Sequence, residues 1–149
     1  MSRPVTIHMA RIAMLTAGVA ALAACGPDGN AAINGISNEV TGSVKEWAVT
    51  VDAAGATAGD VSFTITNDGS IEHEFLVVKT DIPDGEIPIV DDAFPEDAEG
   101  VEVIDELEGF APGESGTLTV ALQPGNYQLV CNIPSHYKAG MHTAFVVQS

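Results

Sequence analysis

The segment "APGESGTLTVALQPGNYQLVCNIPSHYKAGM", residues 111–141, carries the pattern that decides the fold. Apolar and polar residues alternate in "TLTVAL" (117–122), and alternation with period two is typical of a β-strand with one buried face. The turn residues "QPGN" (123–126) follow, and every second residue from Tyr127 to Cys131 then lies on one face. The segment therefore predicts two consecutive strands and a loop that contains Pro and Gly.

The same period-two pattern recurs through most of the chain, and no stretch shows the periodicity of an amphipathic helix. Several short strands with regular turn signals predict an all-β sandwich of about 100 residues. Residues 81–100 interrupt the pattern with three prolines and many carboxylates, which predicts a surface lobe with one helical turn near residues 90–94. The expected strands are residues 47–51, 61–66, 73–79, 101–107, 117–122, 127–131 and 143–147.

The N-terminus has the features of an export signal. Arg3 and Arg11 precede a short apolar run at residues 12–24, too short to span a bilayer as a mature helix. The run ends in "LAAC", which resembles the lipobox of bacterial lipoproteins. The resemblance implies cleavage of residues 1–24 and lipid attachment to the thiol of Cys25. A plain secreted protein and an uncleaved anchor are the alternatives.

The residues after Cys25 are rich in Gly and Asn, with little periodicity. They predict a flexible lipidated tether over residues 25–43, followed by the folded domain at 44–149. Gly26 resembles the residue that follows the lipidated cysteine in lipoproteins sent to the outer membrane rather than the inner one. The expected location is therefore the periplasmic side of a bacterial membrane.

The chain is strongly acidic, with 5 basic and 21 acidic residues. Removal of Arg3 and Arg11 with the signal leaves 3 basic residues and a net charge of about −18. Such a charge disfavours binding to nucleic acid or anionic lipid headgroups and favours cationic partners.

The loop after residue 130 contains a thiol, an imidazole and a thioether at intervals of five: Cys131, His136 and Met141. An exported protein with an unpaired thiol needs an explanation, since oxidising compartments consume spare thiols. A disulfide between Cys25 and Cys131 remains an alternative. Single-copper electron-transfer sites combine two His and one Cys with a weak axial Met, and this loop supplies three of the four.

The second imidazole must come from elsewhere in the fold. His8 leaves with the signal, and strand alternation after Met141 directs His142 away from a metal. His73 remains, at the start of an expected strand and directly after the turn residues "NDGS" (67–70). The candidate ligand set is therefore His73 together with the three residues of the loop.

These residues resemble the cupredoxin family, the type 1 blue copper proteins that include plastocyanin, azurin and rusticyanin. The spacing C-x4-H-x4-M is similar to that of rusticyanin-like members, and the resemblance covers residues 44–149. It implies a Greek-key β-sandwich that binds one copper ion. By this resemblance His73, Cys131 and His136 are the equatorial ligands and Met141 is the axial one.

The resemblance implies an electron carrier rather than an enzyme. A filled His2CysMet site leaves no position open for a substrate, and the sequence shows no other catalytic constellation. One alternative is a periplasmic copper chaperone or store, which typically has Met- or His-rich clusters. Three of the four Met lie in the signal, so the mature chain has no such cluster. A cupredoxin fold that has lost its copper and serves as a docking module is the other alternative.

Two finer expectations concern the site and its partner. Many cupredoxins have Asn directly after the first His, whereas this chain has Glu74, so we hypothesise that the side-chain amide of Asn132 donates to the Glu74 carboxylate. Twelve of the 28 residues at 81–108 are acidic. They predict docking of a basic redox protein such as a c-type cytochrome, unless the acidic run is only a solvated face. The expected oligomeric state is a monomer.

Overall fold

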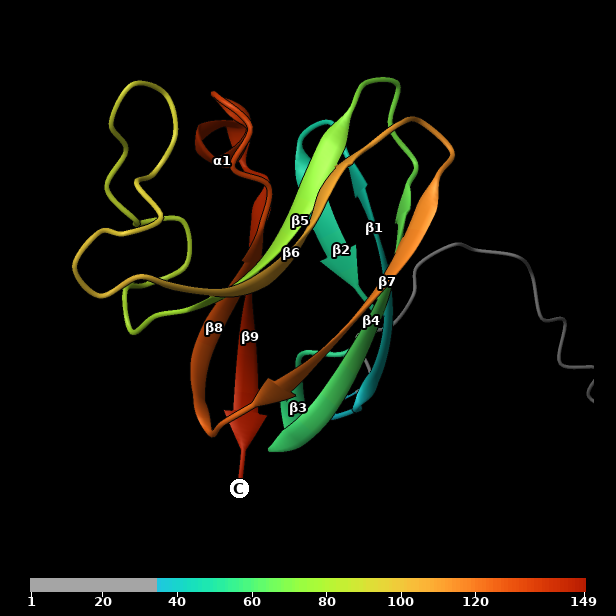
Figure 1. Ribbon diagram of the computed structural model, residues 1–149, viewed down its shortest axis with the longest axis vertical. Coiled ribbons are helices and arrows are strands. Elements are labelled where there is room, and N and C mark those ends of the chain that lie inside the picture. The colour runs from blue at the N-terminus through green and yellow to red at the C-terminus, as the bar shows by residue number, and fades with distance from the viewer. Residues whose placement is uncertain (1–34) are drawn as a thin grey trace, which may run out of the picture. The chain divides into compact units, whose positions relative to one another are not determined.

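The computed structural model describes residues 35–149, which form two β-sheets packed face to face (Figure 1). One sheet has four strands in the order β2-β1-β4-β7, and the other has five in the order β3-β9-β8-β5-β6. The expected all-β sandwich is therefore confirmed. The elements are β1 (Glu39–Lys45), β2 (Ala48–Val51), β3 (Gly55–Thr57), β4 (Gly59–Asn67), β5 (His73–Lys79), β6 (Glu102–Phe110), β7 (Ser115–Leu122), β8 (Gly125–Val130), α1 (His136–Ala139) and β9 (His142–Gln148).

The main core lies between the two sheets and is built by the residues that alternate inward. On β4, Val61, Phe63 and Ile65 are fully buried. The Phe63 ring contacts Phe75 of β5 and Phe145 of β9, with centroids 5.6 Å and 5.4 Å away. Burial of an aromatic side chain of this size is among the largest single contributions to a core. The apolar residues of the alternating sequence pattern thus form the interface between the sheets.

The strand β5 is buried on both faces, which explains its near-continuous apolar sequence. Phe75 and Val77 belong to the core between the sheets, whereas Leu76 and Val78 belong to a second apolar cluster. That cluster also holds residues from β8, from α1 and from the segment 81–101, the loops beside β5 and β8 in Figure 1. The surface lobe therefore rests on the outer face of the five-stranded sheet.

The connections place three chain segments at one end of the sandwich. β5 and β8 are antiparallel, with Leu76 opposite Val130, so the start of β5 lies beside the end of β8. β8 and β9 are antiparallel with Val130 opposite His142, so the start of β9 lies there too. β7 belongs to the first sheet although β6 and β8 belong to the second, a crossing typical of Greek-key sandwiches.

The sequence-based prediction is wrong for two segments at the N-terminal side of the domain. Residues 39–43, expected in the tether, form most of β1, which pairs in parallel with β4 and antiparallel with β2. Residues 55–57, which are not among the expected strands, form β3 and pair in parallel with β9. Both strands are held by pairing with strands distant in sequence, and neither has a local alternation strong enough to predict it.

The helical content also differs from the expectation. The lobe has no helical turn near residues 90–94; instead Val90 and Ala93 form a β-bridge around Asp91 and Asp92, whose φ angles of 51° and 71° are left-handed. Such angles suit Asp and close a tight turn. A helical turn does occur at α1, in the ligand loop. Within residues 35–149, no helix has the length and apolar character needed to cross a membrane.

Candidate metal centre

Three of the four candidate ligands lie where strands begin or end at one end of the sandwich, and the fourth opens the short helix of the ligand loop. His73 is the first residue of β5, and Cys131 directly follows β8. His136 opens α1, and Met141 directly precedes β9. Because these strand ends meet at one end of the fold, residues 58 positions apart such as His73 and Cys131 come into contact.

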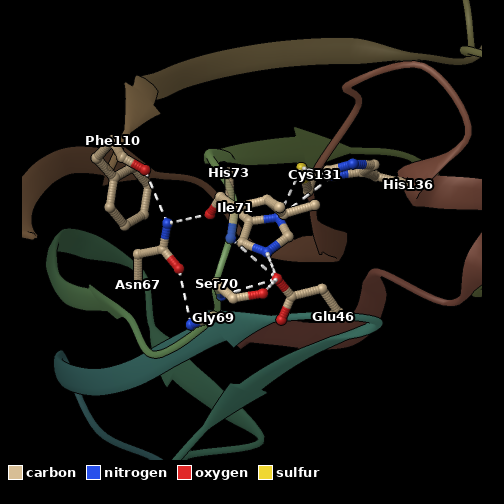
Figure 2. A network of polar contacts seen from close by, with 9 residues as sticks. All are labelled: Glu46, Asn67, Gly69, Ser70, Ile71, His73, Phe110, Cys131 and His136. Carbon is tan, nitrogen blue, oxygen red and sulfur yellow. Dashed lines mark hydrogen bonds and ion pairs between the residues drawn. The ribbon is translucent and has the colours of Figure 1, made fainter. Parts of the chain in front are cut away.

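The donor atoms of three of these residues form a compact triangle (Figure 2). Nδ1 of His73 lies 3.2 Å from Nδ1 of His136. The Sγ atom of Cys131 lies 3.3 Å from Nδ1 of His136 and 4.0 Å from Nδ1 of His73. His73 and Cys131 are fully buried, and His136 is 7% exposed. Two imidazole nitrogens and a sulfur thus converge on one point, the arrangement of a trigonal His2Cys site.

The loop from Cys131 to Met141 is closed by backbone hydrogen bonds. The N–H of Cys131 donates to the carbonyl of Met141 at 3.0 Å, and the N–H of Met141 donates to the carbonyl of His136 at 3.1 Å. The helix α1 ends at Ala139 and is followed by the cap residue Gly140, whose φ of 118° is favoured only for glycine. This turn returns the chain so that Met141, which is fully buried, lies beside Cys131.

Burial sets the protonation of the three donors in the copper-free protein. Desolvation lowers the pKa of His73, to which repulsion from His136 adds, and desolvation likewise lowers the pKa of His136. Desolvation raises the pKa of the Cys131 thiol to about 11. At neutral pH both imidazoles are therefore neutral and each can offer a lone pair. The thiol must lose its proton to bind a metal, so metal binding here releases a proton.

These properties fit copper. The site offers one soft thiolate and two neutral imidazoles in a buried triangle, and within residues 35–149 no carboxylate joins the donor group. Copper would supply a one-electron redox couple when it is bound by these residues.

His142 does not join the donor group. Its Nδ1 lies 3.0 Å from Oδ2 of Asp84 in the lobe, and its ring lies 5.1 Å from that of Tyr137. The histidine therefore connects β9 and α1 to the lobe.

Asn132 does donate a hydrogen bond to Glu74, but the predicted donor group is wrong. The backbone N–H of Asn132, not its side-chain amide, donates to Oε1 of Glu74 at 2.7 Å. The side chain instead donates to the carbonyl of Phe94 and accepts from its N–H. Desolvation and the neighbouring carboxylates raise the pKa of Glu74, although the bond from Asn132 opposes this. Glu74 and Asn132, which follow the ligands His73 and Cys131, are therefore joined through the backbone N–H of Asn132.

Sequence reasoning missed three residues that support the site. Asn67 is fully buried, donates to the carbonyls of Ile71 and Phe110, and accepts from the N–H of Gly69, so it braces the turn before His73 (Figure 2). Its place in the turn sequence "NDGS" was the only available signal. The other two are adjacent residues of the turn between β1 and β2.

These two residues are Glu46 and Trp47. Glu46 accepts from the N–H groups of Ser70 and Ile71. Trp47, expected in a strand, is 50% exposed and its ring meets His136 edge-on at 5.3 Å. Nothing in the local sequence shows that this turn reaches the site, because its position depends on the pairing of β1 with β4.

Comparison with known proteins agrees with the fold and the donor set. The model of the copper-binding proteins of the plastocyanin/azurin family matches residues 49–148. Among solved structures, the chain is similar to reduced auracyanin from the photosynthetic bacterium Roseiflexus castenholzii, with 25% identity, a TM-score of 0.52 and coverage of 77% of this chain and 97% of that chain.

Two other solved structures share the fold at lower identity. Rusticyanin from Thiobacillus ferrooxidans has 18% identity and a TM-score of 0.54, covering 74% of this chain and 76% of that chain. An azurin from Methylomonas sp. strain J has 12% identity and a TM-score of 0.51, covering 74% and 98%. A search among curated proteins found no match.

The fold and the site together define a metalloprotein of the cupredoxin class, with one copper site at the end of a β-sandwich. The chain belongs to the plastocyanin/azurin family of copper-binding proteins. His73, Cys131, His136 and Met141 form its single-copper site.

Proposed function

We propose that this protein carries single electrons between redox partners through a type 1 copper site and catalyses no reaction of its own. The observation that carries the proposal is the buried triangle of Nδ1, Nδ1 and Sγ atoms, 3.2–4.0 Å apart, on strand ends of a rigid sandwich. With Met141 as fourth ligand, the donor set leaves no coordination position for a substrate. Ligands held at the ends of packed strands would move little when the copper changes its oxidation state, and small ligand movement favours fast electron exchange.

The electron would leave through His136. It is the ligand of the triangle with measurable exposure, at 7%, and the half-exposed ring of Trp47 lies against it. Pro134 and Ala139, in the same loop, are exposed as well. These side chains offer an apolar contact surface around the ligand, which suits a brief encounter with another redox protein.

The partner we propose is a basic redox protein, for example a c-type cytochrome. The acidic lobe lies next to the ligand loop, because the N–H of Ser135 donates to the carbonyl of Asp92 at 2.7 Å. Negative charge at this position would steer a cationic partner toward His136 and raise the association rate without requiring a tight complex.

We also propose that the protein is exported and attached by a lipid on Cys25 to the periplasmic side of a bacterial membrane, the outer membrane rather than the inner one. Cys25 and the rest of the expected signal and tether up to residue 34 lie outside the described residues. The support is the short apolar run behind Arg3 and Arg11 and the lipobox-like sequence that ends it.

The test is to load the purified protein with copper and record its visible spectrum and its electron exchange. An electron carrier shows an intense thiolate-to-Cu(II) band, loses it with one electron per protein, regains it on reoxidation and keeps its copper throughout. A copper-handling protein, the alternative, gives a weak band or releases its copper to a chelator after reduction. The second result would refute the carrier function.

A further inference from the structure

The turn between β1 and β2 places a carboxylate behind the first histidine ligand. Oε1 of Glu46 accepts hydrogen bonds from the N–H of Ser70 at 2.8 Å, from its hydroxyl at 3.0 Å and from the N–H of Ile71 at 3.0 Å. The carboxylate is thereby tied to the loop that immediately precedes His73 (Figure 2). An oxygen that accepts three hydrogen bonds and donates none is that of an ionised carboxylate.

Among the described residues, the outer ring nitrogen of His73 has no hydrogen-bond partner. Nδ1 of His73 is directed at Cys131 and His136, whereas Nε2 is fully buried and, among the described residues, makes no hydrogen bond. The carboxylate of Glu46 lies beside this nitrogen, with Oε1 3.9 Å from Nε2. A buried ring nitrogen without a partner is costly, and a carboxylate at this distance favours a proton on Nε2.

The carboxylate of Glu46 and the ring of His73 can approach each other because residue 69 is a glycine. A Cβ atom added at Gly69 would lie 2.9 Å from Oε2 of Glu46 and 2.9 Å from Nε2 of His73. Real Cβ atoms do not approach other atoms so closely, so any side chain at position 69 would push the carboxylate and the ring apart. The absence of a side chain is thus a condition of the contact.

We propose that Glu46 is a positioning residue of the metal site, which holds the Nε2–H tautomer of His73 so that the Nδ1 lone pair faces the metal. Its negative charge beside the ligand also favours Cu(II) over Cu(I) and so lowers the reduction potential. Carboxylates that accept a hydrogen bond from the outer nitrogen of a ligating histidine fix the ring and raise its basicity. At 3.9 Å the Glu46 carboxylate acts in the same direction through its charge rather than through such a bond. The part of this inference that concerns the potential rests on the proposed electron-carrier function; the tautomer part does not.

The test compares Glu46→Gln with the matched control Asp52→Asn. In Glu46→Gln, the side-chain oxygen can still accept from Ser70 and Ile71, but the negative charge beside His73 is removed. Asp52 accepts from the N–H and the hydroxyl of Thr41 at 2.9 Å and 2.6 Å, so its substitution removes the same charge from the same kind of bond. It lies toward the other end of β1 and β2, away from the histidines.

Two measurements are made on each variant. In the copper-free protein, ¹⁵N NMR of the imidazole rings should show His73 as the Nε2–H tautomer in the wild type and in Asp52→Asn, with a reduced fraction in Glu46→Gln. In the copper-loaded protein, the reduction potential of Glu46→Gln should shift upward, while Asp52→Asn stays at the wild-type value. An unchanged His73 tautomer and an unchanged potential in Glu46→Gln would overturn the proposal.

Two further variants keep the proposal testable if Glu46→Gln does not fold. Glu46→Asp retains the charge and should keep the wild-type tautomer, whereas Gly69→Ala retains Glu46 but separates it from the ring and should change the tautomer. The same tautomer in both variants would overturn the proposal. A wild-type protein without the intense visible band would refute the electron-carrier function instead, and the tautomer measurement would still decide the role of Glu46.

Discussion

The backbone N–H of Asn132 donates a 2.7 Å hydrogen bond to Oε1 of Glu74, so the residues that directly follow the ligands Cys131 and His73 are linked to each other. The side chain of Asn132 points to the lobe and pairs in both directions with the backbone of Phe94, at 2.9 Å and 3.0 Å. Asn132 therefore connects the end of β8 both to β5 and to the acidic lobe.

Asn132→Ala should destabilise the protein without removing the copper site. The N–H and the carbonyl of Phe94 would lose their partners in a buried position, at a cost of about 1–3 kcal/mol in unfolding free energy. The backbone bond to Glu74 would remain, so the visible band should persist. Chemical denaturation measures the loss. The control is Asn126→Ala, which removes an exposed bond to Asp81 and should change the free energy by less than about 0.5 kcal/mol. Equal effects of the two substitutions would contradict this role.

Cys131→Ser should abolish the intense visible band while the sandwich stays folded. The thiolate is the strongest donor of the site and the source of the band. The core between the sheets draws apolar residues from all nine strands, so Cys131 is only one of its many members. Absorption spectroscopy and circular dichroism of the copper-treated variant measure the two properties. A variant that keeps the band would show that Cys131 is not the ligand.

Met141→Leu should retain a blue site with a raised reduction potential. Loss of the weak thioether donor disfavours Cu(II), and Leu is close to Met in volume. The substitution at this fully buried position should cost less than about 1.5 kcal/mol in stability. Electrochemical titration of wild type and variant gives the comparison. A potential identical to that of the wild type would mean that Met141 only fills the core.

Neutralising Asp91, Asp92, Glu96 and Asp97 should flatten the salt dependence of electron transfer with a basic cytochrome. Screening at physiological salt acts over about 8 Å, so the wild-type second-order rate should fall steeply as ionic strength rises. Asn suits positions 91 and 92, because it tolerates their left-handed φ angles of 51° and 71°. Stopped-flow kinetics at several salt concentrations measures the slope.

The control for the four lobe substitutions neutralises three carboxylates, Glu39, Asp52 and Asp60, which lie toward the other end of β1, β2 and β4 from the ligand loop. This variant should keep most of the wild-type salt dependence. If neither salt nor the lobe substitutions alter the rate, the lobe serves solubility and does not dock a partner.

Cys25→Ala should abolish lipid attachment. Growth with a labelled fatty acid should label the wild type, and the variant should remain unlabelled because its only possible acceptor thiol at the lipobox is gone. Membrane fractionation should show the variant released from the membrane. Label that persists in Cys25→Ala would exclude the lipoprotein interpretation.

Local sequence determined those parts of the protein whose environment is regular along the chain. The alternation in residues 61–66 and 117–122 predicted β4 and β7, because each has one face in the core and one in solvent. The C-x4-H-x4-M spacing predicted the ligand loop, because these residues are close in the chain and their chemistry is specific. His73 could be selected as the remaining ligand because so few histidines compete with it.

Only the tertiary structure decided the parts that depend on distant pairing. The strand β1 forms because Glu39–Lys45 lies between β2 and β4, and its own sequence contains too little alternation to predict it. The same pairing brings the turn after β1 to the ligands, with Glu46 behind His73 and Trp47 against His136. Such contacts join residues 27 and 89 positions apart, and no local pattern encodes them. They arise because burying the two inner sheet faces sets the register of every strand, and the register then fixes which turns meet at the copper end.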